Sequence, residues 1–363
     1  MSIATTAAAD LRSRAVDAVW YLAAIAGGLL LAAAALAALG VDPGLAYGAI
    51  LSSSLGSLGG LGQTLSKASP LLLGSLAVTL GLRGGYLNIG VDGQVSLGAV
   101  VATGVAFLLA PRLPAPLTIP LVLVAGLAGG LLAVLPAALL RAFWNVSEIF
   151  VTVMLNFVFA ALVDYLATGP WNDPAAGEAI TRPIGAAAQL PALLPGGAHP
   201  GLLLGLATAL LLAWLLARTV LGFEIRATGE NPVAARVGGV DLRRVCLVTL
   251  CLSGAVAGLA GALEVSGYHH RLLNGISPNY GLMAILIAVL GRRSIWGTVV
   301  ASFGFAVLLV GADSLQRSVD LPASAALLFQ AAILLCLLAV EGLRGRLEWF
   351  GRLGGLRPRL RRA

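Results

Sequence analysis

The sequence is poor in charged residues. Asp, Glu, Lys and Arg make up only 11% of its 363 residues, whereas soluble domains carry about 25%. Apolar residues reach 59% and the mean hydropathy is +0.95, which excludes a soluble globular domain. The short alternating segments of a β-barrel are also missing. Because backbone groups in lipid must satisfy one another, these properties predict an all-α polytopic membrane protein.

Motifs of catalysis and metal binding are missing as well. The three cysteines, Cys246, Cys251 and Cys336, lie in apolar runs without CxxC spacing, so we expect them to pack rather than to form a disulfide or a metal site. There is no GxxxxGK[ST] phosphate loop, no HExxH and no GxSxG motif, and the only lysine is Lys67. A lone serine in an apolar run, such as Ser253, usually forms a hydrogen bond between helices rather than acting as a nucleophile. An intramembrane hydrolase is therefore disfavoured. We therefore expect no catalytic residue, metal or cofactor in this chain, and any ATP and Mg²⁺ on a separate subunit.

Ten apolar segments predict about ten transmembrane helices. A helix needs about 20 apolar residues to cross a bilayer. Several of the segments are shorter, so we expect some helices to be broken or re-entrant. The segments span residues 18–40, 68–84, 94–110, 118–140, 147–168, 201–217, 245–264, 278–291, 296–313 and 322–340.

The positive charges predict the orientation. If the N-terminus is cytoplasmic and every segment crosses, 18 of the 23 Lys and Arg residues lie inside. Cytoplasmic loops are enriched in these residues, so the +7 net charge follows the membrane rule and does not indicate nucleic-acid binding. The predicted parts are a cytoplasmic N-terminal segment (1–17), a transmembrane domain (18–341) with a cytoplasmic loop (218–244) and an outer loop (169–200), and a basic cytoplasmic tail (342–363).

The cytoplasmic loop contains a helix-start signal. Residues 222–245 read GFEIRATGENPVAARVGGVDLRRV. Asn231 suits the N-cap and Pro232 the first helical position, while Gly238 and Gly239 end the helix. The pattern predicts a helix of about two turns. Such a helix either docks a soluble partner or only spaces two membrane spans.

A second unusual stretch, residues 82–98, reads LRGGYLNIGVDGQVSLG. Its five glycines disfavour a continuous helix, and Asn88, Asp92 and Gln94 bring polar groups to membrane depth. Irregular backbone and a carboxylate at that depth indicate a solute pathway or an interhelical hydrogen-bond network. Asn156 should face other helices rather than lipid. Glu148 is expected near the cytoplasmic end of its span as an interfacial charge.

Several motifs together resemble a known family. LNIGVDGQ resembles the NIG-x-EGQ signature of permease subunits in bacterial ABC importers for simple sugars and nucleosides. GFEIRATGENPVAARVGG resembles the cytoplasmic coupling loop of that family, and VSEIFVTVMLNF, NGISPNYGLMAILIAVLG and GADSLQRSVDLPAS resemble further segments in the same order. The resemblance covers residues 66–340. It departs from the family at Asp92, where Glu is usual, and at Val237, where an aromatic residue is common.

The resemblance implies roles for particular residues. Coupling to the ATPase falls on Gly229, Glu230, Asn231, Pro232, Ala235 and Arg236. The signature element near the translocation pathway comprises Asn88, Gly90, Asp92, Gly93 and Gln94, and Asn156 is the remaining pathway candidate. From these residues alone, Asn88 and Asp92 either contact the solute or only hold a broken helix.

The resemblance also implies partners and a mechanism. The chain would be a permease subunit in the bacterial cytoplasmic (inner) membrane, importing a small polar solute such as a nucleoside or simple sugar by alternating access. A separate ATPase with two nucleotide-binding domains would drive it, and a membrane-anchored substrate-binding lipoprotein would deliver the solute. The outer-loop sequence TGPWNDP resembles the larger permease of nucleoside-type systems, which implies a heterodimer with a second related permease. The alternative is an ion-coupled secondary transporter that uses Asp92 as its coupling carboxylate and needs no ATPase.

Overall fold

The computed structural model describes residues 42–318, together with positions 26–31, 33–34, 37–38, 331 and 335. The predicted tail, residues 342–363, and the predicted segment 1–17 lie outside the described residues, as does nearly all of the apolar segment 322–340. The chain divides into two units, one formed by residues 1–53 and 311–363 and the other by residues 54–310. The functional segments all belong to the second unit.

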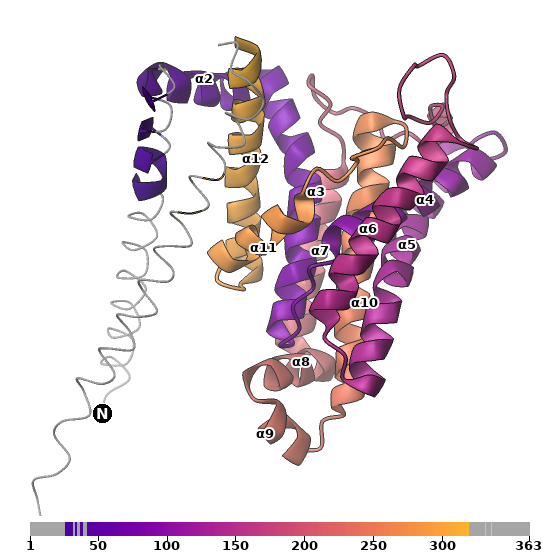
Figure 1. The fold of residues 1–363 in the computed structure, drawn as a ribbon, viewed down its shortest axis with the longest axis vertical. Helices are drawn as coiled ribbons and strands as arrows, with labels where there is room; N and C mark the ends of the chain where they lie inside the picture. The colour runs from indigo at the N-terminus through magenta and orange to yellow at the C-terminus, as the bar shows by residue number, and fades with distance from the viewer. Residues whose placement is uncertain are drawn as a thin grey trace, which may run out of the picture. The chain divides into compact units, whose positions relative to one another are not determined.

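The described residues are nearly all helical (Figure 1). The long helices of the second unit are α3 (Leu58–Arg83), α4 (Val91–Leu109), α5 (Ala115–Trp144), α6 (Glu148–Thr168), α7 (Gly201–Arg218) and α10 (Leu242–Leu263). Shorter elements are η1 (Ala186–Ala188), α8 (Val220–Glu230), α9 (Pro232–Val237), a π-helical turn η2 (Glu264–His269) and α11 (Tyr280–Leu290). Helices α2 (Pro43–Leu55) and α12 (Ile295–Ser318) each continue from one unit into the other.

Seven helices within the described residues are long and apolar enough to cross a membrane. This confirms the predicted all-α polytopic membrane protein. Helix α11 fills the predicted segment 278–291 but has only 11 residues, which at 1.5 Å per residue is about half of a bilayer. Helix α3 begins ten residues before the predicted segment 68–84, because Ser57 caps it through Gly60 N–H at 2.9 Å.

The centre of the second unit is α10, which packs against α3, α4 and α5. Two glycine contacts show how closely these helices cross. A Cβ atom on Gly258 would lie 2.2 Å from the Gly126 carbonyl oxygen, and one on Gly130 would lie 2.1 Å from the Gly254 carbonyl oxygen. Helices in lipid associate through such close van der Waals packing, because lipid supplies little hydrophobic drive between them. Glycines therefore allow α5 and α10 to cross with their backbones in contact.

Helix α6 lies at the periphery of this unit. Only 11% of its most apolar window is buried, and Phe150, Met154, Phe157 and Tyr165 are 58–73% exposed. A helix that is apolar all round suits a lipid-facing or subunit-facing position. Two of its polar residues, Glu148 and Asn156, contact the irregular segment before α4 and the first turn of α4.

Candidate functional site

Helix α9 is the short helix that the sequence predicts. The Asn231 side-chain oxygen accepts hydrogen bonds from Val233 N–H at 3.1 Å and Ala234 N–H at 3.0 Å, and Pro232 occupies the first helical position. The helix ends at Gly238, and Gly239 follows with φ +87°, a conformation that glycine adopts without strain. Both the predicted start and the predicted end are confirmed.

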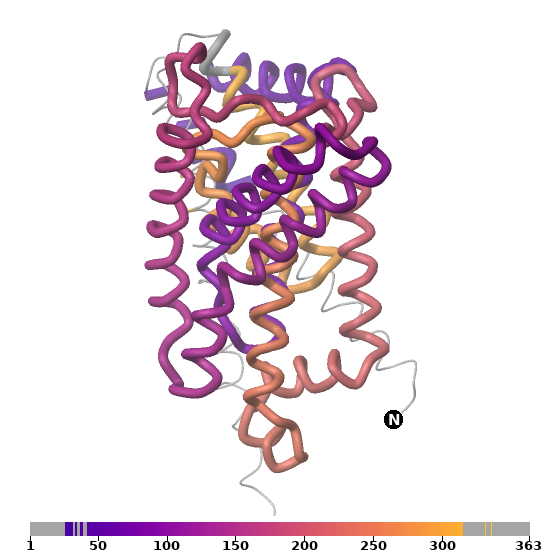
Figure 2. The backbone as a smooth tube through the Cα atoms, turned by 90° about the vertical axis from the view of Figure 1, so that its right-hand side faces the viewer, coloured from indigo at the N-terminus to yellow at the C-terminus, as the bar shows by residue number. Residues whose placement is uncertain are grey.

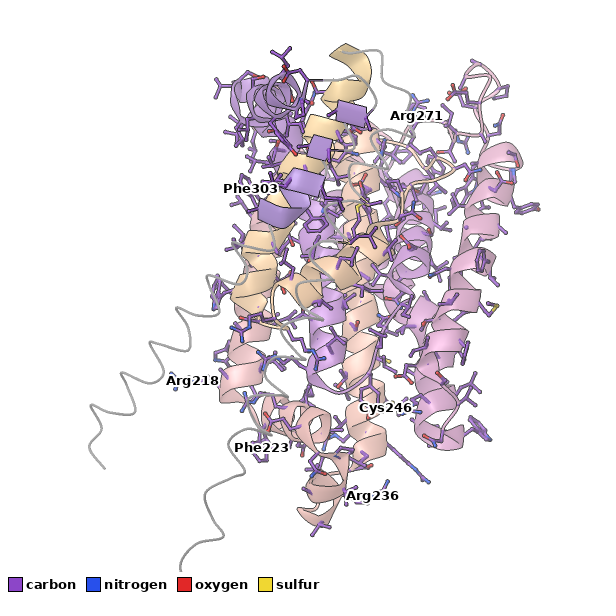
Figure 3. All side chains as sticks on the ribbon, turned by 60° about the vertical axis from the view of Figure 1, so that its left-hand side comes forward. Arg218, Phe223, Arg236, Cys246, Arg271 and Phe303 are labelled. Carbon is purple, nitrogen blue, oxygen red and sulfur yellow. The ribbon has the colours of Figure 1, made fainter. Side chains whose placement is uncertain are left out.

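One side of α9 is buried against the rest of the chain and the other is exposed. Ala235 is buried, whereas Val233 is 72% and Val237 86% exposed. The two valines are four residues apart and so lie on one face. Figure 2 shows α9 beyond the ends of α5 and α6, and in Figure 3 Arg236 marks the same end of the molecule. An exposed apolar pair on a rigid, capped helix can pack against a partner.

The backbone next to α9 touches the turn that leads into the polar stretch 82–98. A Cβ atom on Gly229 would lie only 2.1 Å from the Arg83 carbonyl oxygen, and one on Gly85, whose φ is +80°, would lie 3.2 Å from the Gly229 Cα. Arg83 also donates its Nε–H to the Arg293 carbonyl oxygen at 2.6 Å. The turn at residues 83–85 thus contacts both the α8–α9 segment and the turn between α11 and α12.

The polar stretch itself is held by a closed set of amide hydrogen bonds. Asn88 Nδ2 donates to Gln94 Oε1 at 2.9 Å, and Gln94 Nε2 donates back to Asn88 Oδ1 at 2.8 Å. Asn88 Nδ2 also donates to Ser253 Oγ at 2.8 Å, and Ser253 Oγ donates to the Ala77 carbonyl oxygen at 2.7 Å. Asn88 is fully buried and Gln94 nearly so, and buried amides need such partners. These bonds fasten the irregular residues 84–90 to α3, α4 and α10.

Asn156 fastens the same stretch to α6. Its Oδ1 accepts from Gly93 N–H at 2.8 Å, and its Nδ2 donates to the Ile89 carbonyl oxygen at 3.0 Å. The N–H groups of a first helical turn have no partner within the helix, so Asn156 satisfies one of them from a neighbouring helix. The expectation that Asn156 faces other helices is confirmed.

Asp92 connects the first turn of α4 to the start of α11. Its Oδ1 accepts from Ser277 Oγ at 2.7 Å and from Gly281 N–H at 2.8 Å. A Cβ atom on Gly281 would lie 2.5 Å from Asp92 Oδ2, so any larger residue there would displace the carboxylate. A carboxylate is favourable at a helix N-terminus because of the free N–H groups and the helix dipole. Asp92 therefore caps the half-length helix α11 from another part of the chain.

Glu148 differs from its prediction as an interfacial charge. It is only 6% exposed, its Oε2 lies 3.2 Å from Arg141 Nε, and its Oε1 accepts from Leu87 N–H at 3.3 Å. A carboxylate is buried at little cost only when it is paired and hydrogen-bonded, and the fold brings both partners to it. The residue is a support of the 84–90 turn.

At the other end of the helices, a buried polar cluster anchors the segment 169–200. Glu264 in η2 accepts from Tyr280 O–H at 3.2 Å and lies 3.1 Å from His269 Nε2. The His199 ring packs on Gly267, and its Nδ1 accepts from Gly201 N–H at 3.1 Å. Burial lowers the pKa of His199 below 6.5, because the cation loses hydration.

The structure thus brings the predicted residues together in two places. The residues predicted to couple to an ATPase lie on α8 and α9 and at their junction, and the four residues predicted for the pathway lie at or next to the first turn of α4. The turn at residues 83–85 joins the two groups. Sequence reasoning did not assign Glu148, Ser277, Gly281 or Arg83 to this arrangement. All four lie in stretches that the sequence analysis singled out, but nothing in the sequence indicates which residues they contact.

The chain is similar to transport permeases along most of its length. It is 39% identical over 319 residues to the glucose ABC transporter permease protein of Haloferax volcanii, covering 85% of this chain and 83% of the relative. It is 31% identical over 324 residues to the guanosine ABC transporter permease protein of Bacillus subtilis, covering 86% and 91%. The nucleoside ABC transporter permease protein of Lactococcus lactis is 29% identical over 327 residues, covering 86% and 90%.

A family model agrees with these relatives. The family described as branched-chain amino acid transport system / permease component matches residues 60–338, a range that contains the α4 element, α9 and α11. The resemblance carried by LNIGVDGQ and GFEIRATGENPVAARVGG is therefore confirmed. This multi-span membrane protein belongs to the branched-chain amino acid transport system / permease component family, as an ABC transporter permease.

Proposed function

We propose that this chain is the permease through which an ATP-driven importer moves a nucleoside or simple sugar across the cytoplasmic membrane. The substrate class is supported by the relatives, whose names specify glucose, nucleosides and guanosine. ATP and Mg²⁺ are assigned to a separate ATPase subunit, because the sequence has no phosphate loop of its own. The observation that carries the proposal is the Gly229–Arg83 backbone contact, which connects the exposed helix α9 to the polar stretch 84–94.

The contacts suggest how force is transmitted. When an ATPase bound to α9 moves, Gly229 presses on the turn at residues 83–85. The displacement passes through the Asn88–Gln94 pair to the first turn of α4, and through Asp92 to the start of α11. Arg83 carries it to the α11–α12 turn through the Arg293 carbonyl. Alternating access is then a rearrangement of α4 and α11 relative to α3 and α10, because packed interfaces switch between discrete arrangements.

The remaining partners complete the transporter. A second, related permease forms a heterodimer with this chain, and the solute passes between the two. A membrane-anchored lipoprotein delivers solute to the outer side, where the ordered segment 169–200 packs on η2 and the following loop. The excess of positive charge on one side supports placing both termini in the cytoplasm. Selectivity rests mainly with the binding lipoprotein.

The first experiment is a mild-detergent purification of the tagged full chain from its native membrane, followed by mass spectrometry. We expect an ATPase with two nucleotide-binding domains and a second permease. Glu230→Ala and Pro232→Ala should lower ATPase recovery while membrane insertion stays normal, whereas Gly304→Ala, at a site with open space around it, should change neither. Full recovery and uptake in both coupling variants would contradict the assignment of α9.

Uptake assays separate the importer from the ion-coupled alternative. Labelled guanosine and glucose are offered to cells that carry the complete transporter, with and without an uncoupler that collapses ion gradients. Uptake should survive the uncoupler as long as ATP is maintained, and it should compete with unlabelled nucleosides or sugars. Loss of uptake with the ion gradient, at constant ATP, would favour Asp92 as a coupling carboxylate. Equilibrium binding to the purified lipoprotein then distinguishes nucleoside from sugar.

A further inference from the structure

A pocket of about 450 Å³ lies beside α9. Its wall is formed by the 84–86 turn, the C-terminal end of α5, the α8–α9 junction and the first turns of α10. It therefore touches both sides of the Gly229 contact, the α8–α9 junction and the 84–86 turn. Its size is within the range of about 300–1,000 Å³ typical of ligand sites, and it can accept a side chain with its flanking backbone.

The pocket is positively charged. Arg141, Arg236 and Arg243 line it, and no acidic residue does. Arg141 is paired with Glu148, but neither Arg236 nor Arg243 forms an ion pair with any residue that the structure describes. Asp241, two residues before Arg243, uses its Oδ1 to accept hydrogen bonds from the backbone N–H groups of Arg243 and Arg244. Two guanidinium groups thus remain available to an external anion.

Two further features of the pocket favour binding of a hydrogen-bond acceptor. The Arg243 guanidinium carbon lies 6.0 Å from the centroid of the Phe143 ring, a cation–π contact that limits its orientations. Thr228 also lines the pocket and is only 4% exposed, yet its Oγ1 has no hydrogen-bond partner within the described chain. Buried hydroxyl groups are almost always paired. The unpaired hydroxyl is a donor that an incoming acceptor can use.

We propose that this pocket receives an acidic side chain of the ATPase subunit, as a second docking point beside α9. The proposal rests on the proposed function. A carboxylate matches a guanidinium in shape and charge and can accept from it in a bidentate manner, with Thr228 as a third donor. The ATPase is the partner because Arg236 belongs to α9 itself, so that a subunit covering Val233 and Val237 is next to the pocket. Binding there also places the partner against the 84–86 turn.

The scarcity of lysine makes a direct test feasible. The chain has a single lysine, Lys67, inside α3, whereas the pocket is lined by Gly84, which follows the last residue of that helix. Arg243→Lys keeps the charge and introduces an amine. A water-soluble carbodiimide activates a carboxylate, and an amine in contact with that carboxylate then forms an amide bond with it. One carboxylate oxygen is transferred to the reagent, which leaves as a urea. Arg244→Lys is the matched control, because Arg244 is the next residue and does not line the pocket.

In the purified complex, we expect Arg243→Lys to give a permease–ATPase cross-link to an Asp or Glu of the ATPase, located by mass spectrometry. Arg244→Lys should give at least about tenfold less of this cross-link, since a carbodiimide adds no spacer and the amine and carboxylate must be in direct contact. Equal cross-linking by both variants, or none by Arg243→Lys in an intact complex, would overturn the proposal.

Charge reversal provides an independent readout. Arg243→Glu should lower the recovered ATPase per permease at least about tenfold relative to Arg244→Glu, because a close like charge costs far more than a peripheral one. If Arg243→Glu instead removes bound anionic phospholipid and leaves the ATPase in place, the pocket is a lipid site and the proposal is wrong. If the wild-type chain recovers no ATPase at all, the proposed function fails first, so the two failures are distinguishable.

Discussion

Replacing Gly229 with alanine tests the transmission path most directly. Gly229 lies in α8, where alanine is the better helix former by about 1 kcal/mol. The substitution should therefore stabilise the helix if only local propensity matters. The new Cβ, however, would lie 2.1 Å from the Arg83 carbonyl oxygen. Backbone cannot yield as a flexible side chain does, so α8 and the 83–85 turn must move apart by roughly 1 Å, at a cost of about 1–3 kcal/mol typical of overpacking.

The predicted phenotype of Gly229→Ala is uncoupling. The Asn231 cap and the exposed valines of α9 are unchanged, so the ATPase should still be recovered with the complex. Contact between α8 and the 83–85 turn is displaced, so solute uptake into proteoliposomes should fall at least about tenfold, as misplacements of 1 Å can do. ATP hydrolysis should lose its stimulation by the loaded binding protein.

The control for this variant is Gly304→Ala, a helical glycine that has open space around it. Both variants add one methyl group to a helix, and only Gly229→Ala adds it against another backbone segment. If Gly229→Ala transports as well as Gly304→Ala and keeps stimulated hydrolysis, the contact does not transmit motion. If it instead loses the ATPase altogether, its role is docking rather than transmission.

Three other variants address the α9 cap, the contact of Asp92 with α11, and His199. Asn231→Ala removes two N-cap hydrogen bonds, so α9 should lose about 1 kcal/mol and ATPase recovery should fall; Asn231→Asp, which keeps the acceptor, should restore it. Asp92→Asn keeps an acceptor for Gly281 N–H but removes the charge at the α11 N-terminus; complex yield should hold while uptake falls, and unchanged uptake would make Asp92 a packing residue only. Because the pKa of His199 is lowered below 6.5, the unfolded chain binds the extra proton first as the pH falls. The stability that His199 contributes is therefore fully present above pH 6.5, and it is lost as the pH falls from 6.5 to the lowered pKa of the folded state. Between pH 8 and 5, the unfolding temperature of the wild-type complex should fall with pH, and that of the His199→Gln complex should fall less. If the two unfolding temperatures change with pH in parallel, His199 is not the source of the pH dependence.

Much of this protein could be predicted from local patterns. Hydropathy determines which segments enter lipid, and most of the predicted spans in the described chain coincide with helices. The start of α9 depends on Asn231 and Pro232 alone, since capping involves residues two or three apart. The glycines of residues 84–90 likewise predict the break between α3 and α4. These features follow from interactions within a few residues, which is why sequence reasoning recovers them.

The roles of the buried polar residues were decided by the tertiary structure. Asp92 meets Gly281 across 189 positions of sequence, and Asn88 meets Ser253 across 165. Spacing gives no sign of such pairs, because each depends on how two distant helices pack. Glu148 illustrates the consequence: its position suggested an interfacial charge, yet the fold buries it between Arg141 and the Leu87 backbone.

The amino-acid sequence by itself therefore determined the membrane class, the short helix α9 and the family signature. It could not determine that Gly229 rests on the Arg83 carbonyl or that α11 begins at a carboxylate of α4. Hydropathy and capping are set by short-range chemistry, whereas a transmission path requires atoms from separate helices to touch. Only the packed structure places them within reach of one another.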